Sequence, residues 1–142
     1  MVSKTFFDNH LDALKECVNL ASDEIMQIYN SDSFDQEEKS DGSPLTIADK
    51  KSNEIILNSL EKISKDISII SEETFSEDLI KSLDQTYWLV DPLDGTKEFI
   101  NKTGEFTVNI AMINNKKVVF GIVGAPVTLS LIHISEPTRR HL

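Results

Sequence analysis

The residues best suited to chemistry in this 142-residue chain lie between positions 87 and 99. The apolar run Trp88–Val90 leads directly into Asp91, and Asp94 follows just before Gly95. An apolar run of this kind is typical of a buried strand, and a proline and a glycine after it predict a tight turn at its end. Carboxylates held on a rigid turn are ligands that a hard divalent cation such as Mg²⁺ prefers. The segment therefore predicts a metal site at the end of a strand.

A further carboxylate, Glu72, ends a second apolar run at 67–71. Taken alone, Asp-Pro and Asp-Gly are ordinary turn sequences, and Glu72 with Glu73 is an ordinary solvated pair. The order of Glu72, Asp91 and Asp94 within a span of 25 residues, each after an apolar run, favours a shared site for two or more Mg²⁺ ions. In such sites one ion activates a water while another steadies the leaving oxygen at phosphorus. The pattern predicts a metal-dependent phosphate site.

A short helix is predicted directly after this segment, at 96–100. Backbone N–H groups at the start of a helix attract anions, so the amides of Gly95 and Thr96 could hold a phosphate. An N-cap role for Thr96 is compatible with that. Asp49 could accept a hydrogen bond from the Thr96 hydroxyl and so help to orient a water, although its spacing alone favours a simple capping role.

Two helices are expected before these strands. Apolar residues three and four apart predict an amphipathic helix with an inner face formed by Leu11, Leu14, Val18, Ala21, Ile25 and Ile28. After a polar loop at 31–43, Pro44 and a capping box of Thr46 with Asp49 predict the start of a second helix. Its inner face is formed by Ala48, Ser52, Ile55, Ile56, Leu60 and Ile63.

Strands are predicted at 67–71, 87–91, 105–113 and 117–125, with a hairpin turn at 114–116. Two helices followed by a run of strands indicate an α+β or layered α/β fold.

Composition limits the classes of partner. With 24 acidic and 14 basic residues the formal net charge is −10, which argues against binding a nucleic-acid polymer. It is compatible with a small phosphorylated substrate, because bound divalent cations reverse the local field. The single cysteine, Cys17, cannot form an internal disulfide, and no apolar run is long enough to cross a bilayer. With no signal-peptide pattern at the start, we expect a cytoplasmic protein; association with the inner face of the membrane and the oligomeric state stay open.

Residues 88–96 resemble the first signature of the inositol monophosphatase superfamily of Mg²⁺-dependent phosphatases. Within that superfamily, further segments are similar to the CysQ-type 3′(2′),5′-bisphosphate nucleotidases, at 41–49, 70–73, 97–100 and 104–111. The resemblance implies the N-terminal half of the inositol monophosphatase-like sugar phosphatase fold, with two helices packed on a mostly antiparallel sheet. It also implies hydrolysis of the 3′-phosphate of adenosine 3′,5′-bisphosphate to AMP and phosphate, in sulfur assimilation. An inositol-1-phosphate phosphatase is the alternative, against which Lys97-Glu98-Phe99 weighs.

Site roles follow from the same resemblance. It implies two or three Mg²⁺ ions, the first held by Glu72, Asp91 and the Leu93 carbonyl, and the second by Asp91 and Asp94.

The resemblance further implies that Glu72 and Thr96, with Asp49 behind Thr96, prepare the attacking water. Contacts with the substrate are implied for Glu72, Leu93, Asp94, Gly95 and Thr96.

The last fifteen residues, 128–142, differ from the rest of the chain. They hold both arginines and two of the three histidines, whereas residues 1–127 use lysine alone as the strongly basic residue. They also do not resemble the family's continuation, a second half whose Trp-Asp signature supplies another metal ligand. We therefore predict a truncated N-terminal domain at 1–127 and an atypical, non-native tail at 128–142. On this hypothesis the chain is a catalytically incomplete fragment, because catalysis needs both ends of the reaction positioned.

Overall fold

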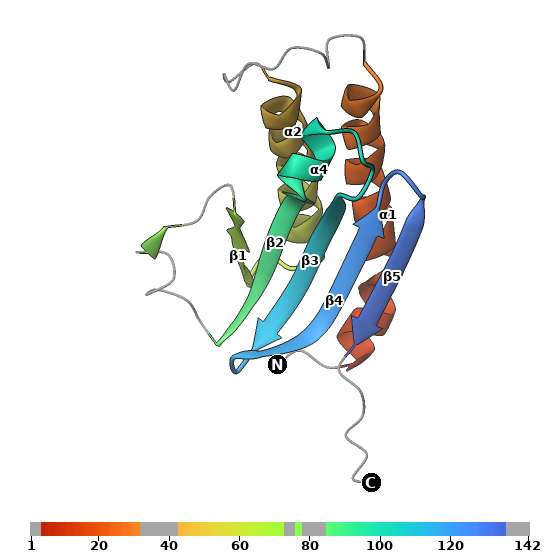
Figure 1. Cartoon of the computed structure of the whole chain (residues 1–142). Coiled ribbons are helices and arrows are strands. Elements are labelled where there is room, and N and C mark those ends of the chain that lie inside the picture. The colour runs from red at the N-terminus through yellow and green to blue at the C-terminus, as the bar shows by residue number, and fades with distance from the viewer. Residues whose placement is uncertain (1–3, 32–42, 73–75, 78–84, 136–142) are drawn as a thin grey trace, which may run out of the picture.

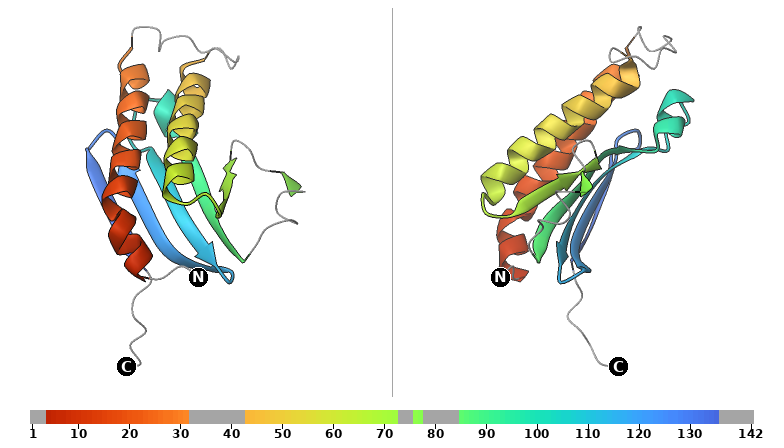
Figure 2. Two further views of the ribbon diagram at one scale, coloured as in Figure 1. Left: turned by 180° about the vertical axis from the view of Figure 1, so that it is seen from behind. Right: turned by 90° about the vertical axis from the view of Figure 1, so that its left-hand side faces the viewer.

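The computed structural model describes residues 4–31, 43–72, 76–77 and 85–135. Helices α1 (Lys4–Tyr29) and α2 (Pro44–Ile63) lie side by side and cover one face of a five-stranded sheet (Figures 1 and 2). The strands are, in their order across the sheet, β1 (Ser68–Ser71), β2 (Thr86–Asp94), β3 (Thr107–Asn114), β4 (Lys117–Ala125) and β5 (Ser130–Ser135). The short helix α4 (Thr96–Ile100) lies between β2 and β3 in the chain.

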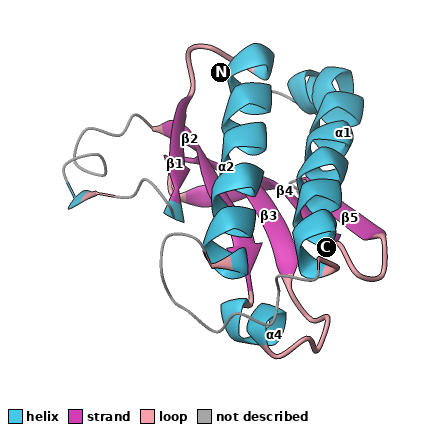
Figure 3. Ribbon diagram, turned by 90° about the horizontal axis from the view of Figure 1, so that it is seen from above, coloured by secondary structure: helices cyan, strands magenta, loops and turns pink. Residues whose placement is uncertain are grey.

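The predicted layered arrangement of two helices on a mostly antiparallel sheet is confirmed. β1 pairs with β2 in parallel, and each later pair is antiparallel. Seen from above, the two helices run across the same face of the sheet (Figure 3). In the described part of the chain, neither of these helices, nor α4, is long and apolar enough to span a membrane.

Both predicted helix faces form the core. On α1 the residues Leu14, Val18, Ala21 and Ile25 are fully buried, and on α2 so are Ala48, Ser52, Ile56 and Leu60. Leu11 and Ile28 of the first predicted face, and Ile55 and Ile63 of the second, are half-buried. Cys17 is buried beside them, and burial raises the pKa of its thiol to about 11. Cys17 is therefore part of the packed core.

The start of α2 differs from the prediction. Ser43, not Thr46, is the N-cap: it has an extended backbone, and its hydroxyl oxygen accepts a hydrogen bond from the Thr46 N–H at 3.2 Å. Pro44 then occupies the first helical position, where its missing N–H costs nothing. Asp49 therefore lies one turn further into the helix than a capping acid, so the capping-box role predicted for it is wrong. Most of the predicted polar loop, 32–42, lies outside the described residues.

The hairpin predicted between the third and fourth strands is confirmed. β3 ends at Asn114 and β4 begins at Lys117. The two residues between them, Asn115 and Lys116, have φ angles of 52° and 64°, which is the left-handed backbone that tight two-residue hairpins use.

Strand β2 is longer than predicted. It continues through Asp94 instead of turning after Asp91, and it pairs Asp91 with Asn109 and Asp94 with Thr107. β2 has one more residue than β3 between those pairs, so the expected tight turn is a β-bulge inside the strand.

Strand β5 was not predicted. It lies in the segment 128–142 and pairs with β4 from Ala125↔Ser130 to Phe120↔Ser135. Residues 136–142 lie outside the described residues, and the division of the chain at 127 stays a prediction.

The sheet face turned away from the two helices is apolar and exposed. We call it the open face, after Leu89, Val123, Ile132 and Ile134, whose exposed fractions are 44%, 38%, 64% and 66%. Val123 pairs directly with Ile132, and directly paired residues project to the same side of a sheet.

The opposite face packs closely on α1. A Cβ at Gly124 would lie 2.4 Å from Cγ1 of Val18, so β4 approaches the helix closely only because this position lacks a side chain.

Candidate active site

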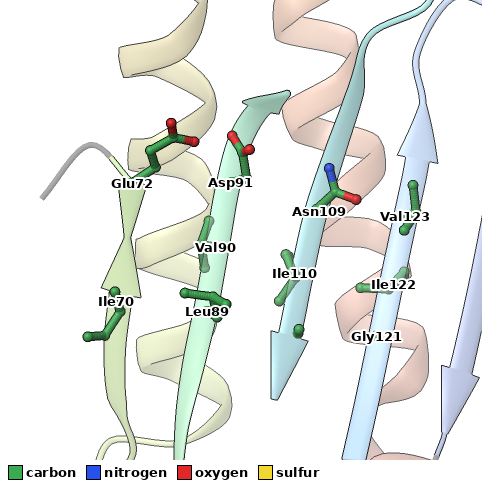
Figure 4. Close-up of a pocket in the computed structure, with 11 residues that line it drawn as sticks. Ile70, Glu72, Leu89, Val90, Asp91, Asn109, Ile110, Gly121, Ile122 and Val123 are labelled. Carbon is green, nitrogen blue, oxygen red and sulfur yellow. The ribbon is translucent and has the colours of Figure 1, made fainter. Parts of the chain in front are cut away.

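Two carboxylates meet at the ends of neighbouring strands. Ser71 at the end of β1 pairs with Val90 on β2, so the residues that follow them, Glu72 and Asp91, lie next to each other. Figure 4 shows the two side chains turned toward one another, and the carboxyl of Asp91 hydrogen-bonds with that of Glu72. The sequence analysis expected these acids to share a site, and the structure brings them together.

This arrangement concentrates negative charge. The pKa of Asp91 is raised from 3.8 to about 7, first because the side chain is partly buried, then because of its hydrogen bond with Glu72 and the charges of Glu72 and Asp94. A backbone hydrogen bond with Leu93 acts in the opposite direction and lowers the pKa. A carboxyl whose ionisation is opposed by neighbouring acids is suited to bind a cation, because the cation would offset the repulsion between the carboxylates.

The bulge in β2 sets the positions of the other predicted ligands. Asp94 is exposed at the end of the strand, close enough for its charge to influence Asp91, while the Leu93 side chain is buried in the core. A ligand role for the Leu93 carbonyl stays a prediction.

Gly95 is required where β2 gives way to α4. Its φ of 94° lies in the left-handed region, and a Cβ there would stand 3.1 Å from the Glu105 carbonyl oxygen and 3.2 Å from the Phe106 Cα. Gly95 is the N-cap of α4, so an N-cap role for Thr96 is wrong; the exposed Thr96 is the first helical residue. The predicted helix itself is confirmed, and its one buried residue is Phe99, packed edge-on against Phe106 at 5.1 Å.

Asp49 lies in the first half of α2, half-buried, on a helix that contacts both β2 and α4. A hydrogen bond between Asp49 and the Thr96 hydroxyl stays a prediction.

A hollow of about 460 Å³ begins at the acid pair and continues over the open face. Glu72, Asp91 and Asn109 supply its polar end, as Figure 4 shows. The rest of its lining is largely apolar and includes Leu89 and Val123.

Several polar residues at this site were missed from the sequence. Asn109 faces the hollow because it pairs with Asp91 across the sheet, and its side-chain amide donates to the Thr107 hydroxyl at 2.9 Å. Ser52 and Asn53 reach the acidic strand ends from α2. Only the pairing of strands and the placement of α2 reveal these contacts, so no local signal could have found them.

The donor set fits a hard cation in its chemistry. All of its members are oxygens, and two of the carboxylates touch. Within the ranges that the structure describes, however, no three His, Cys, Asp or Glu side chains gather into a ready metal cluster. The pair Glu72 and Asp91 is therefore the part of the predicted site that is assembled, with Asp94 at its margin.

A sheet of this order with two helices on one face occurs in solved structures of the inositol monophosphatase fold. The crystal structure of CysQ from Bacteroides thetaiotaomicron, described as a bacterial member of the inositol monophosphatase family, matches with a TM-score of 0.81 and 40% identity over 92% of this chain and 47% of that one. The model of the inositol monophosphatase family matches residues 8–139. The chain belongs to the inositol monophosphatase family.

Within this family, the chain is similar to curated bisphosphate nucleotidases. The 3′(2′),5′-bisphosphate nucleotidase CysQ of Shigella flexneri is 45% identical over 118 residues, which cover 82% of this chain and 48% of that protein. The protein of the same name from Salmonella typhimurium is 42% identical over 127 residues, which cover 89% and 52%. The chain spans about half the length of the curated relatives it matches.

Proposed function

We propose that this chain is the part of a Mg²⁺-dependent 3′(2′),5′-bisphosphate nucleotidase that supplies the carboxylate ligands of the metal site. The reaction is hydrolysis of the 3′-phosphate of adenosine 3′,5′-bisphosphate to AMP and phosphate. The observation that carries the proposal is the contact between Glu72 and Asp91 at the mouth of the hollow. The similarity to CysQ nucleotidases over more than four-fifths of the chain supports the choice of substrate.

The proposed ligands of two or three Mg²⁺ ions are the carboxylates of Glu72, Asp91 and Asp94 and the carbonyl of Leu93. When bound, Mg²⁺ would polarise the phosphate and lower the pKa of an attacking water. The ions would also neutralise the charge that raises the pKa of Asp91, which makes the acid pair and the cation mutually stabilising.

The chain's own residues supply the remaining roles. Glu72, which is exposed at the mouth of the hollow, accepts the proton of the attacking water. The Thr96 hydroxyl orients that water, with Asp49 behind it. The substrate phosphate is held along 93–96, where the strand ends and α4 begins.

The cellular setting is part of the proposal. A lone buried cysteine fits a reducing compartment, and we place the protein in the cytoplasm, where it would clear the nucleotide by-product of sulfur assimilation. Association with a membrane finds no support in the comparisons and is not proposed.

The test uses the 142-residue chain, with phosphate release and cation binding measured in parallel. Asp91→Asn is the site variant, and Asp23→Asn, at an exposed position of α1, is the matched control. Release from adenosine 3′,5′-bisphosphate that depends on Mg²⁺ and is lost only in Asp91→Asn would support the proposal. Faster phosphate release from inositol 1-phosphate than from adenosine 3′,5′-bisphosphate would overturn the proposed substrate assignment. Cation binding without release would show that the other half of the relatives is needed for turnover, and no cation binding would refute the metal site.

A further inference from the structure

We propose that Ser52 and Asn53, neighbours on α2, are positioning residues that hold the two acid-bearing strand ends together for cation binding. The inference rests on the proposed metal site and adds to it two residues that bind neither metal nor substrate. It is argued from two buried hydrogen bonds that connect one helix to two strands.

Ser52 holds the bulge of β2. Its side chain is fully buried, and its hydroxyl donates to the Pro92 carbonyl at 2.7 Å. Pro92 lies inside the bulge, between the register pairs of Asp91 and Asp94, where the ladder with β3 is interrupted. A buried carbonyl in such a place needs a donor from elsewhere, and Ser52 supplies it. The hydroxyl therefore fixes the backbone directly between the two aspartates.

Asn53 holds the end of β1. It is 7% exposed, and its side-chain oxygen accepts a hydrogen bond from the fully buried hydroxyl of Ser71. Ser71 is the last residue of β1 and directly precedes Glu72. It also pairs with Val90, the residue before Asp91. The bond thus fixes the segment that presents Glu72.

The two bonds fix the strand ends that carry Glu72 and Asp91. One of these strands, β1, is only four residues long, so its own pairing with β2 holds its end by few contacts. Consecutive helical residues point in directions about 100° apart, so Ser52 and Asn53 can each reach a different strand. One rigid helix is thereby bonded to both strand ends, and it opposes their separation before a cation arrives. Groups that hydrogen-bond a metal ligand directly change metal affinity about 10–100-fold when removed. Ser52 and Asn53 act through the neighbours of the ligands, Pro92 and Ser71, so we expect an effect at the lower end of that range.

The experiment measures Tb³⁺ luminescence with the full chain, and Mg²⁺ by competition, well below the unfolding temperature. The variants are Ser52→Ala and Asn53→Ala, with Ser52→Thr as the conservative replacement that keeps the hydroxyl. Ser59→Ala is the matched control, because Ser59 is a half-buried serine of α2 that bonds to Cys17, away from the acid pair. Amide hydrogen exchange at Leu93 and Asp94 is followed in the same samples.

We expect Ser52→Ala and Asn53→Ala each to weaken Tb³⁺ binding by about tenfold or more, and Ser59→Ala to leave it within about twofold. Ser52→Thr should recover most of the affinity. Exchange at Leu93 and Asp94 should be faster in Ser52→Ala than in Ser59→Ala. If Ser52→Ala does not fold, Ser52→Cys, which keeps the shape of the side chain with a slightly larger atom and a weaker donor, takes its place.

Unchanged affinity in Ser52→Ala would overturn the positioning role while leaving the metal site intact. Failure of the unsubstituted chain to bind Tb³⁺ would instead overturn the proposed metal site. In that case hydrogen exchange decides the structural claim: faster exchange at Leu93 and Asp94 in Ser52→Ala supports it, and unchanged exchange refutes it.

Discussion

Replacing Asp91 with asparagine should stabilise the metal-free protein at alkaline pH while removing its affinity for divalent cations. The reason is the environment of this carboxyl, which is partly buried and lies against Glu72 with Asp94 nearby. Ionising it is unfavourable in the folded chain and unhindered in the unfolded one. An amide of the same shape avoids that cost but offers a cation only a neutral oxygen.

The direction and the size of this stability difference follow from the pKa of Asp91. Because folding raises the pKa of Asp91 from 3.8 to about 7, the folded state binds the proton more tightly between those values. The contribution of this group is therefore most favourable below pH 4, declines as the pH rises, and is fully unfavourable above pH 7. Each pKa unit corresponds to about 1.4 kcal/mol. Since the side chain is only partly buried, solvent screening reduces the sum, and we expect about 1–2 kcal/mol.

Urea unfolding in a chelating buffer at pH 4 and pH 8 measures the difference between Asp91→Asn and the unsubstituted chain. The difference should be near zero at pH 4 and should favour the variant at pH 8. Adding Mg²⁺ at pH 8 should then raise the stability of the unsubstituted chain alone. Asp23→Asn serves as the control for loss of one negative charge. A variant that is no more stable at pH 8, or equally shifted at both pH values, would refute the electrostatic reasoning.

Two glycine substitutions test how the strands are positioned. Gly124→Ala should lower the free energy of unfolding by about 1–3 kcal/mol relative to Gly121→Ala on the same strand, because only the first places a methyl against Val18; equal melting temperatures would contradict this packing. Gly95→Ala should cost about 1–2 kcal/mol through its left-handed backbone alone, and more through contact with the neighbouring strand. Gly95→Ala should also weaken cation binding, measured by Tb³⁺ luminescence. Unchanged affinity would contradict the expectation that the backbone conformation at Gly95 positions the acidic site.

The features predicted correctly from the sequence are those that local periodicity encodes. The inner faces of α1 and α2 repeat every three to four residues, and the polar residues at 114–116 predict the hairpin between β3 and β4. Each of these can be recognised without knowing what lies next to it in space.

The features that were missed depend on partners distant in the chain. The bulge in β2 exists only in relation to β3, and Ser52 becomes a site residue only because Pro92 lies opposite it, 40 positions away. The N-cap of α2 is a local exception: Ser43, with an extended backbone directly before Pro44, caps the helix in place of Thr46. Strand β5 forms because the edge of β4 is open to it, despite the unusual composition of its segment.

The open face also affects the thermodynamics of unfolding. Its large apolar side chains, including Leu89, Ile132 and Ile134, are already hydrated in the folded chain. Unfolding therefore transfers less new apolar surface to water than in a domain buried on both sides of its sheet. The heat-capacity change should fall below the usual value of about 12–15 cal/mol/K per residue. A smaller heat-capacity change makes the curve of stability against temperature flatter, so this chain should lose less stability on cooling than other proteins of its length.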